Sequence, residues 1–270
     1  MKKQYKLGVI GSGETVNAIL KGAVLSDFIR PKKIIVNAVT EEDTENAQDL
    51  GLHITDDNRY IAENCEFLLV AVNPAEFEDT VKSLEGFKPE KVISVMAGVK
   101  KNTIKNALGV GLIKVARSVL NAPSVIGSGS ICLDMTDFNK STDDTEFIYG
   151  LFANLGIVVS VDESKLHASA ALSDGGTASV FMFIQSFIEA GVKQGLPKGE
   201  AKIIAVQTVL GCAEMVQREE NSVDELLINS CGKNGGGIEA VKVLEDGGFR
   251  RIVCNAIDAS AARTEDVSDK

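Results

Sequence analysis

The stretch that decides the fold is Tyr5-Lys-Leu-Gly-Val-Ile-Gly-Ser-Gly-Glu-Thr-Val16, an apolar run followed by a glycine-rich turn. Apolar residues recur at helical spacing from Glu14 to Leu25. Gly11 permits a tight turn, and Gly13 lets the backbone approach a pyrophosphate, which then lies at the helix N-terminus. A strand, a G-x-G turn and a helix in this order predict a dinucleotide-binding unit. The alternative is a glycine-rich turn in an α/β protein that binds no nucleotide.

Short apolar runs alternate with helical segments through the first half of the chain. Near-continuous apolar strands separated by helices are typical of a parallel, doubly wound sheet. We therefore expect an α/β fold with a Rossmann-type domain over residues 1–162. Its strands after Tyr5–Ile10 are expected at Lys33–Val36, 66–72, Lys91–Val95, Ile113–Ala116 and Ile157–Val161.

The second half changes character near residue 163, where β-rich runs stop and long helical patterns begin. We expect an all-helical domain over residues 163–270, with helices at 177–194, 198–219, 238–246 and 249–262. The first of these helices carries apolar residues nearly all round, which indicates burial on every side. In a domain of this size, so much burial predicts that a partner subunit covers the helix.

Composition excludes several classes of function. The chain has 28 Lys and Arg against 38 Asp and Glu, a formal net charge of −10. This balance disfavours a broad surface for nucleic acid or an anionic membrane, although backbone N–H groups can still bind an anion. The five cysteines form no C-x-x-C pair and only two histidines exist, so we expect no metal site. With no targeting segment evident, we expect a cytoplasmic protein.

The residues after the second expected strand bear on the choice of cofactor. An acid at the strand tip would hold the ribose 2′-hydroxyl of NAD, whereas small polar or basic residues admit the 2′-phosphate of NADP. Here the sequence is Val36-Asn-Ala-Val-Thr40, with no acid and no Arg. This mildly favours NADP. NAD stays the alternative, because Glu41 and Glu42 follow closely and would repel a phosphate that they face.

Several further motifs follow the glycine turn in a distinctive order. They are Leu69-Val-Ala-Val-Asn-Pro74, Ser94-Val-Met-Ala-Gly98, Ala171-Leu-Ser173 and Val243-Leu-Glu-Asp-Gly-Gly-Phe-Arg250, the last followed by Asn255-Ala256. In their order along the whole chain, they resemble the pyrroline-5-carboxylate reductase family. The motif at 243–250 is the most specific, because generic dinucleotide enzymes have no reason to share it.

The resemblance implies a Rossmann domain, an all-helical dimerisation domain, and a homodimer or larger homo-oligomer. It also implies NAD(P)H-dependent reduction of Δ1-pyrroline-5-carboxylate, a small cyclic imine, to L-proline in proline biosynthesis. The family's active site forms where the two domains meet, helped by the partner subunit. Its cofactor contacts carry over to Ile10, Gly11, Ser12, Gly13, Glu14, Thr15, Asn37, Asn58, Ala71, Val72, Asn73, Pro74, Ala97, Gly98 and Asn121.

The chain departs from the family at three motifs. The family's M-P-N-T-P reads Val119-Leu-Asn-Ala-Pro123, which keeps the Asn and the second Pro but loses a Thr and a Pro. The family's S-G-S-G-P-A reads Ser173-Asp-Gly-Gly-Thr-Ala178, which puts Asp174 where the family has Gly. Its substrate loop S-P-G-G-T-T reads Gly232-Lys-Asn-Gly-Gly-Gly237, without the hydroxyls that would help hold the substrate. As a hypothesis, the substrate carboxylate binds backbone N–H groups and the Lys233 charge instead. The expected substrate-binding residues are Lys233, Asn234, Gly235, Gly236 and Gly237.

No catalytic residue is assigned, because a cyclic imine can take its proton from solution near neutral pH. His167 could donate a proton near the domain junction, but a structural partner is the favoured interpretation. Asp174 could contact a cationic substrate group, but a helix N-cap before Thr177 is favoured.

Two alternative functions stay open at this point. One is a paralogue that reduces a different small cyclic imine, which the altered 232–237 loop predicts. The other is a nucleotide-binding regulatory protein without catalysis, which would bind cofactor and transfer no hydride.

Overall fold

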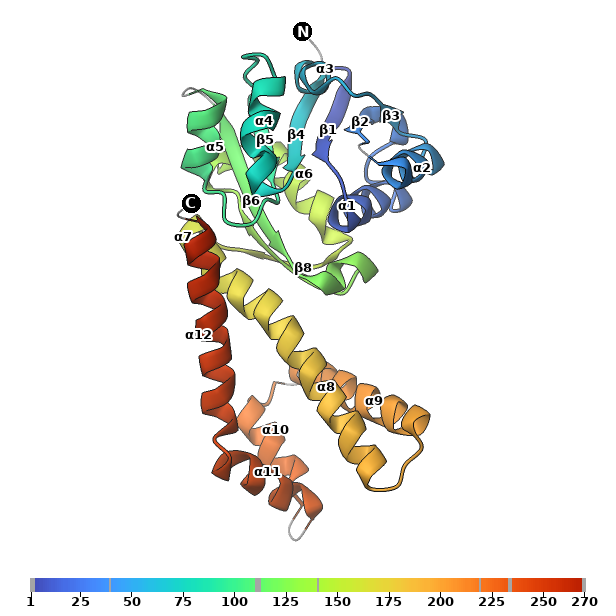
Figure 1. Ribbon diagram of the computed structural model, residues 1–270, viewed down its shortest axis with the longest axis vertical. Helices are drawn as coiled ribbons and strands as arrows, with labels where there is room; N and C mark the ends of the chain where they lie inside the picture. The colour runs from blue at the N-terminus through green and yellow to red at the C-terminus, as the bar shows by residue number, and fades with distance from the viewer. Residues whose placement is uncertain are drawn as a thin grey trace. The chain divides into compact units, whose positions relative to one another are not determined.

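The computed structural model describes residues 3–38, 40–109, 113–139, 141–218, 220–232 and 235–268 (Figure 1). The chain forms two compact units: the first contains Met1–Asp174 and Ser260–Lys270, and the second contains Gly175–Ala259. The boundary at residues 162/163 stays a prediction from sequence pattern. Within the described ranges, no helix has the length and apolar character needed to cross a bilayer.

An eight-stranded sheet with the order β3-β2-β1-β4-β5-β6-β7-β8 forms the centre of the first unit. β1 pairs in parallel with β2 on one side and β4 on the other, so the strand order reverses direction beside β1. The expected strands appear as β1, β2, β4, β5, β6 and β8. The bounds are β1 (Tyr5–Gly11), β2 (Ile34–Asn37), β3 (His53–Ile54), β4 (Cys65–Ala71), β5 (Lys91–Ser94), β6 (Lys114–Leu120), β7 (Gly129–Asp134) and β8 (Gly156–Ser160).

The sheet departs from the expected all-parallel arrangement at β7, which pairs with β6 in antiparallel fashion. The connection from β6 to β7 is a short 3₁₀ turn, Ala122–Ile126, rather than a crossover helix. A connection this short returns the chain in the opposite direction, whereas parallel neighbours need a crossover of a dozen residues or more. β8 then pairs in parallel with β7.

Helices cover both faces of the sheet, as expected for a doubly wound fold (Figure 1). Alternation along β1 sends Leu7 and Val9 into a core shared with α1, α2 and α6, and sends Ile10 into a core shared with α3, α4 and α5. The helices are α1 (Glu14–Leu25), α2 (Glu41–Asp49), α3 (Asn58–Asn64), α4 (Phe77–Ser83), α5 (Lys101–Leu108), α6 (Thr142–Ala153) and α7 (Glu163–Ala170).

The second unit is helical throughout its described elements. α8 follows a π-helical turn over Ala171–Gly175, and α8 packs closely on α9 where Gly191 lies beside Ala201. α12 begins in the second unit and ends in the first. The helices are α8 (Gly176–Lys193), α9 (Lys198–Arg218), α10 (Val223–Ser230), α11 (Gly236–Asp246) and α12 (Phe249–Ser268). α10 was not expected from the sequence.

Candidate functional site

The glycine turn joins β1 to α1 at the carboxyl end of the sheet. Gly11 has φ +120°, and a Cβ there would collide with the backbone oxygen of Ala71, its partner on β4. Gly13 has φ +102°, and a Cβ there would project into open space. No side chain caps the start of α1, so its first backbone N–H groups stay available as donors. The turn therefore offers a backbone-lined cradle suited to an anion.

A central cleft of about 400 Å³ opens beside this turn, at the carboxyl ends of β1, β4 and β5. In open α/β sheets, ligands bind at this edge, where the strand order reverses. Many of the expected cofactor residues meet here: Ser12, Glu14, Thr15, Ala71, Val72, Asn73 and Ala97. The cleft also includes Val16, Val95 and Met96. The cradle and the cleft together fit a dinucleotide.

Other expected cofactor residues do not line the central cleft. The Asn37 side-chain amide donates to Asn58 Oδ1 at 2.6 Å, and the Asn58 amide donates to Ser83 Oγ at 2.9 Å. Ile10 is buried in the core of the sheet. Asn121 Oδ1 accepts a hydrogen bond from the backbone N–H of Ser130 at 2.9 Å, which holds the turn between β6 and β7. Pro74 begins a 3₁₀ turn that Asn73 caps through the N–H of Ala75.

An unexpected acid, Asp43, reaches the glycine turn from the first turn of α2. Its Oδ1 accepts the backbone N–H of Gly13 at 3.4 Å, and its Oδ2 accepts the Thr40 hydroxyl at 2.6 Å. Asp43 and Thr40 also form a capping box at the start of α2. Burial alone would raise the pKa of Asp43, but the hydrogen bonds from Thr40 and Gly13 hold it below its usual range. The carboxylate is therefore ionised at neutral pH.

A second pocket of about 460 Å³ adjoins the central cleft, because both are lined by Val95 and Ala97. The second pocket also includes Gly98, and it lies entirely within the first unit. Its remaining lining residues are Lys100, Arg117, Ser118, Val119, Leu120, Glu163, Ser164, Leu166, His167, Ala170, Asp174 and Thr264. A small substrate held there would lie next to the dinucleotide cleft.

The favoured interpretation of Asp174 as a helix N-cap is wrong, while the structural partner favoured for His167 stays a prediction. His167 is exposed and lines the second pocket, and its side chain forms no hydrogen bond or ion pair with a described residue. Asp174 does not cap a helix: the chain continues through the π-helical turn, and Gly175 is the N-cap of α8. Asp174 lines the same pocket, where burial raises its carboxyl pKa. A π-turn is frequently found at functional sites because it re-aims the side chains it carries.

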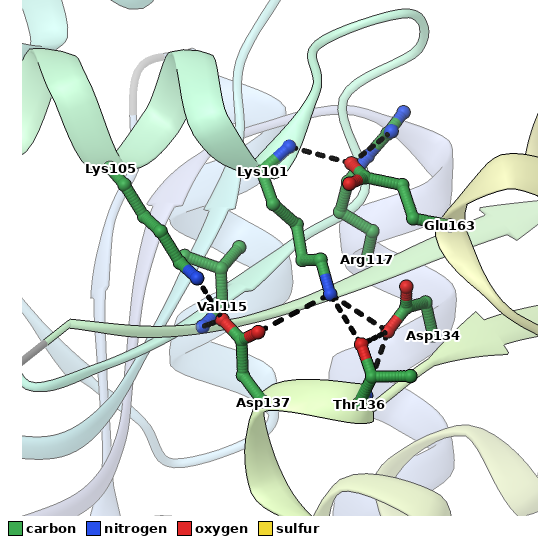
Figure 2. Close-up of polar contacts among 8 residues, drawn as sticks. All are labelled: Lys101, Lys105, Val115, Arg117, Asp134, Thr136, Asp137 and Glu163. Atoms are coloured by element: carbon green, nitrogen blue, oxygen red, sulfur yellow. Dashed lines mark hydrogen bonds and ion pairs between the residues drawn. The ribbon is translucent and has the colours of Figure 1, made fainter.

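An ion pair that the sequence analysis missed lies in the wall of the second pocket (Figure 2). Arg117 on β6 donates to Glu163 Oε1 at 2.8 Å, and the same oxygen accepts the backbone N–H of Lys101 at 2.6 Å. Glu163 thus ties the start of α7 to β6 and α5. A charged residue inside the apolar run Lys114–Leu120 was the signal in the sequence, since Arg is almost never buried without a partner.

A second cluster of charges lies behind this wall (Figure 2). The Lys101 ammonium contacts Asp134 Oδ1 at 3.1 Å, the Thr136 hydroxyl at 2.6 Å and Asp137 Oδ1 at 3.4 Å. Asp134 is fully buried, while Lys105 binds Asp137 from the outer side at 2.6 Å. Burial opposes ionisation of Asp137, but the bonds from Lys105 and a backbone N–H lower its pKa. This cluster fixes the elements that carry the pocket.

The expected substrate loop belongs to the second unit. Gly235 precedes α11 and donates its N–H to Gly232 O at 2.8 Å, and no side chain caps the helix. Gly236 and Gly237 form the first turn of α11. Lys233 and Asn234 lie outside the described residues. The role of this loop in binding substrate stays a prediction.

Two family comparisons cover much of the chain. Residues 163–267 match the family described as pyrroline-5-carboxylate reductase dimerisation. Residues 6–98 match the family described as NADP oxidoreductase coenzyme F420-dependent. The glycine turn and the central cleft fall in the second match, which agrees with an NAD(P)-binding oxidoreductase fold.

Similar proteins align over nearly the full length. A pyrroline-5-carboxylate reductase of Methanosarcina acetivorans is 29% identical over 99% of this chain and 100% of its own. The structure of a pyrroline-5-carboxylate reductase from Coxiella burnetii has a TM-score of 0.89 and 28% identity, covering 98% of this chain and 99% of the other. A Plasmodium falciparum pyrroline carboxylate reductase solved with NADP bound shares the fold at 24% identity, with a TM-score of 0.86 and coverage of 99% and 100%.

The dimerisation match over residues 163–267 and the full-length similarity make this chain similar to pyrroline-5-carboxylate reductases.

Proposed function

We propose that this protein reduces Δ1-pyrroline-5-carboxylate to L-proline with NAD(P)H, as a homo-oligomeric enzyme of proline biosynthesis. The observation that carries the proposal is the pairing of the central cleft with the second pocket through Val95 and Ala97. A hydride can pass only between atoms in contact, so the nicotinamide and imine sites must adjoin. The family similarity supplies the substrate class.

The chain's own residues bind and orient the reactants in this proposal. Backbone N–H groups at the start of α1 hold the pyrophosphate, and the carboxyl ends of β4 and β5 flank the dinucleotide. Bound NAD(P)H supplies a hydride to the imine carbon while the nitrogen takes a proton, which leaves NAD(P)⁺ and a saturated ring amine. Among the side chains that line the second pocket, the imidazole of His167 and the carboxyl of Asp174 are suited to exchange that proton.

The direct test is oxidation of NADPH or NADH by the purified protein with Δ1-pyrroline-5-carboxylate, with proline identified as product. Turnover with proline formation is the expected result. A folded protein that binds cofactor but consumes none with this substrate would reject the proposed reaction.

A second candidate function is reduction of a different small cyclic imine. It is favoured by Asp174, an acid in the pocket wall that forms no hydrogen bond or ion pair with a described residue. A carboxylate there suits a substrate with an additional cationic group. A panel of cyclic imines, with and without such a group, separates the two candidates by their kcat/KM values.

The substrate loop can be tested by restoring its hydroxyls. At Gly236 a Cβ meets no atom within 4 Å, and at Gly237 the first contact is at 3.5 Å, so both positions have space for a Cβ. If the loop binds the substrate carboxylate, Gly236→Thr with Gly237→Thr lowers KM for Δ1-pyrroline-5-carboxylate. Gly199→Thr on α9, also in open space, is the control. An unchanged KM in the double variant would show that the missing hydroxyls do not limit substrate binding.

A further inference from the structure

The tip of β2 and the first turn of α2 bear on which dinucleotide the cleft accepts. NADP differs from NAD by a phosphate on the 2′-hydroxyl of the adenosine ribose, a group that this edge of a Rossmann sheet receives. The phosphate is accommodated where cations and free donors meet it. The hydroxyl is accommodated where an acid accepts its hydrogen bond.

The acid is present here, although it does not stand at the strand tip. Asp43 comes from the first turn of α2, and its contact with the Gly13 N–H at 3.4 Å puts its carboxylate beside the glycine turn. Thr40 holds the same carboxylate by its hydroxyl at 2.6 Å and by its backbone N–H at 3.3 Å. The acid is therefore ionised, fixed in position and within reach of a group held by the turn.

Two side-chain donors beside the strand tip are already engaged. The Thr40 hydroxyl donates a hydrogen bond to Asp43, and the Asn37 amide donates one to Asn58. Two more acids, Glu41 and Glu42, share the first turn of α2 with Asp43. The local field therefore repels a dianion.

Cations do not offset these acids. From Ile34 to Asn58 the sequence contains no Lys or Arg. The next base, Arg59, is bound by Glu63 and Glu85. Lys21 lines a groove between α1 and α2, but Glu14 and Glu42 line the same groove.

We propose that this protein uses NADH in preference to NADPH, and that Asp43 is the residue that discriminates between them. The inference rests on the proposed binding of a dinucleotide in the central cleft. The Asp43 carboxylate accepts a hydrogen bond from the 2′-hydroxyl of NADH and repels the 2′-phosphate of NADPH. The sequence alone mildly favours NADP, because it does not reveal that α2 brings an acid to the glycine turn.

The test measures the dissociation constants of NADH and NADPH by fluorescence titration of the full-length protein, without substrate. We expect NADH to bind about tenfold or more tightly than NADPH, as a fixed like charge opposes the phosphate. Added salt screens this repulsion and narrows the difference. Equal affinities, or tighter binding of NADPH, would overturn the proposal.

Two substitutions assign the effect to Asp43. Asp43→Asn keeps an acceptor for Thr40 and removes the charge, so the ratio of the two dissociation constants should fall by about fivefold or more. Asp43→Ser serves the same purpose if the first variant folds poorly. Asp49→Asn removes one charge from the last turn of the same helix and should leave the ratio unchanged. An NADH preference that survives loss of the Asp43 charge would contradict the role of this residue.

Failure of this proposal can be told apart from failure of the proposed reaction. A preference for NADH without turnover of any imine contradicts the proposed reaction and leaves the cofactor assignment intact. Turnover with equal use of both cofactors overturns the cofactor assignment and leaves the proposed reaction intact. Absence of binding by either dinucleotide overturns both.

Discussion

Gly11 lies at φ +120° and faces the backbone of Ala71 so closely that a side chain has no space. The same residue ends β1 and opens the cradle at the start of α1. Backbone conformation, strand pairing and the candidate site therefore constrain one position together. Gly13 is constrained differently, since its φ is also positive but a Cβ at this position would meet no atom within 4 Å.

Gly11→Ala is expected to destabilise the protein beyond the roughly 1–2 kcal/mol that a strained backbone conformation costs, because a backbone clash adds to it. Urea unfolding measures the change. Gly86→Ala is the control, because Gly86 has φ +80° with open space around it and carries the strain alone. Equal losses in the two variants would mean that β1 and β4 can separate to admit the methyl group.

At the scale of the elements, local pattern predicted most of the first unit. The apolar runs of β1, β4 and β5 and the helical spacing of α1 are properties of contiguous residues, so the sequence displays them directly. β7 was missed because its apolar residues, Ile131–Leu133, form a short run flanked by glycine, serine and aspartate, and its direction depends on its partner. The Arg117–Glu163 pair and the Asp43–Gly13 contact were missed for the same reason, because they join residues far apart in the chain.

Lys101 joins α5 to β7 through the fully buried Asp134. Lys101→Met leaves that carboxylate without its cation and is expected to cost about 3–5 kcal/mol in the free energy of unfolding. Adding Asp134→Asn removes the unpaired charge and should recover part of the loss. Lys105→Met is the control: its side chain is 30% exposed, and a pair of that kind contributes about 1 kcal/mol or less. Similar losses for Lys101→Met and Lys105→Met would show that the buried charge is not the cause.

The start of α6 responds to pH through Asp144, which binds the Lys91 ammonium of β5 at 2.6 Å. Burial opposes ionisation, but the hydrogen bonds from Lys91 and Ser141 lower the pKa of Asp144 below its unfolded value. A lowered pKa adds stability that is present above the unfolded pKa and is lost as pH falls through the folded pKa. The melting temperature should therefore fall on acidification below about pH 4.

Asp144→Asn isolates this contribution. The variant should be less stable at neutral pH by about 1.5–3 kcal/mol, the range for a hydrogen bond to a charged group, and should lose less on acidification than the wild type. Asp143→Asn, at an exposed neighbouring position, should follow the wild-type curve. Parallel acid profiles for the wild type and Asp144→Asn would assign the acid sensitivity to other carboxylates.

At the scale of the molecule, the second unit exposes more apolar surface than a solitary chain tolerates. None of the residues of α8 is buried, and Met182 is 73% exposed. On α9, Ile203 is 70% exposed. Contiguous apolar faces of this kind mark protein–protein interfaces. With the dimerisation-family match, they indicate a homo-oligomer that buries these helices, as the apolar pattern of α8 predicted.

Met182→Glu combined with Ile203→Glu should convert the oligomer to monomer and lower the melting temperature, because charge is then buried in the interface. Sedimentation measures the mass. Ile126→Glu is the control, since Ile126 is 79% exposed but lies in the first unit. An oligomer that persists in the double variant would locate the interface elsewhere.

Because α12 contributes to the second pocket, the wall of this pocket is completed late in synthesis. Residues 5–98 supply the glycine turn and the central cleft, whereas Thr264 of α12 lines the second pocket beside Gly98 and His167. The second unit, Gly175–Ala259, is synthesised after residues 5–98 and before Thr264. A nascent chain therefore acquires its nucleotide cleft early and completes the wall of the adjoining pocket only after that unit has emerged.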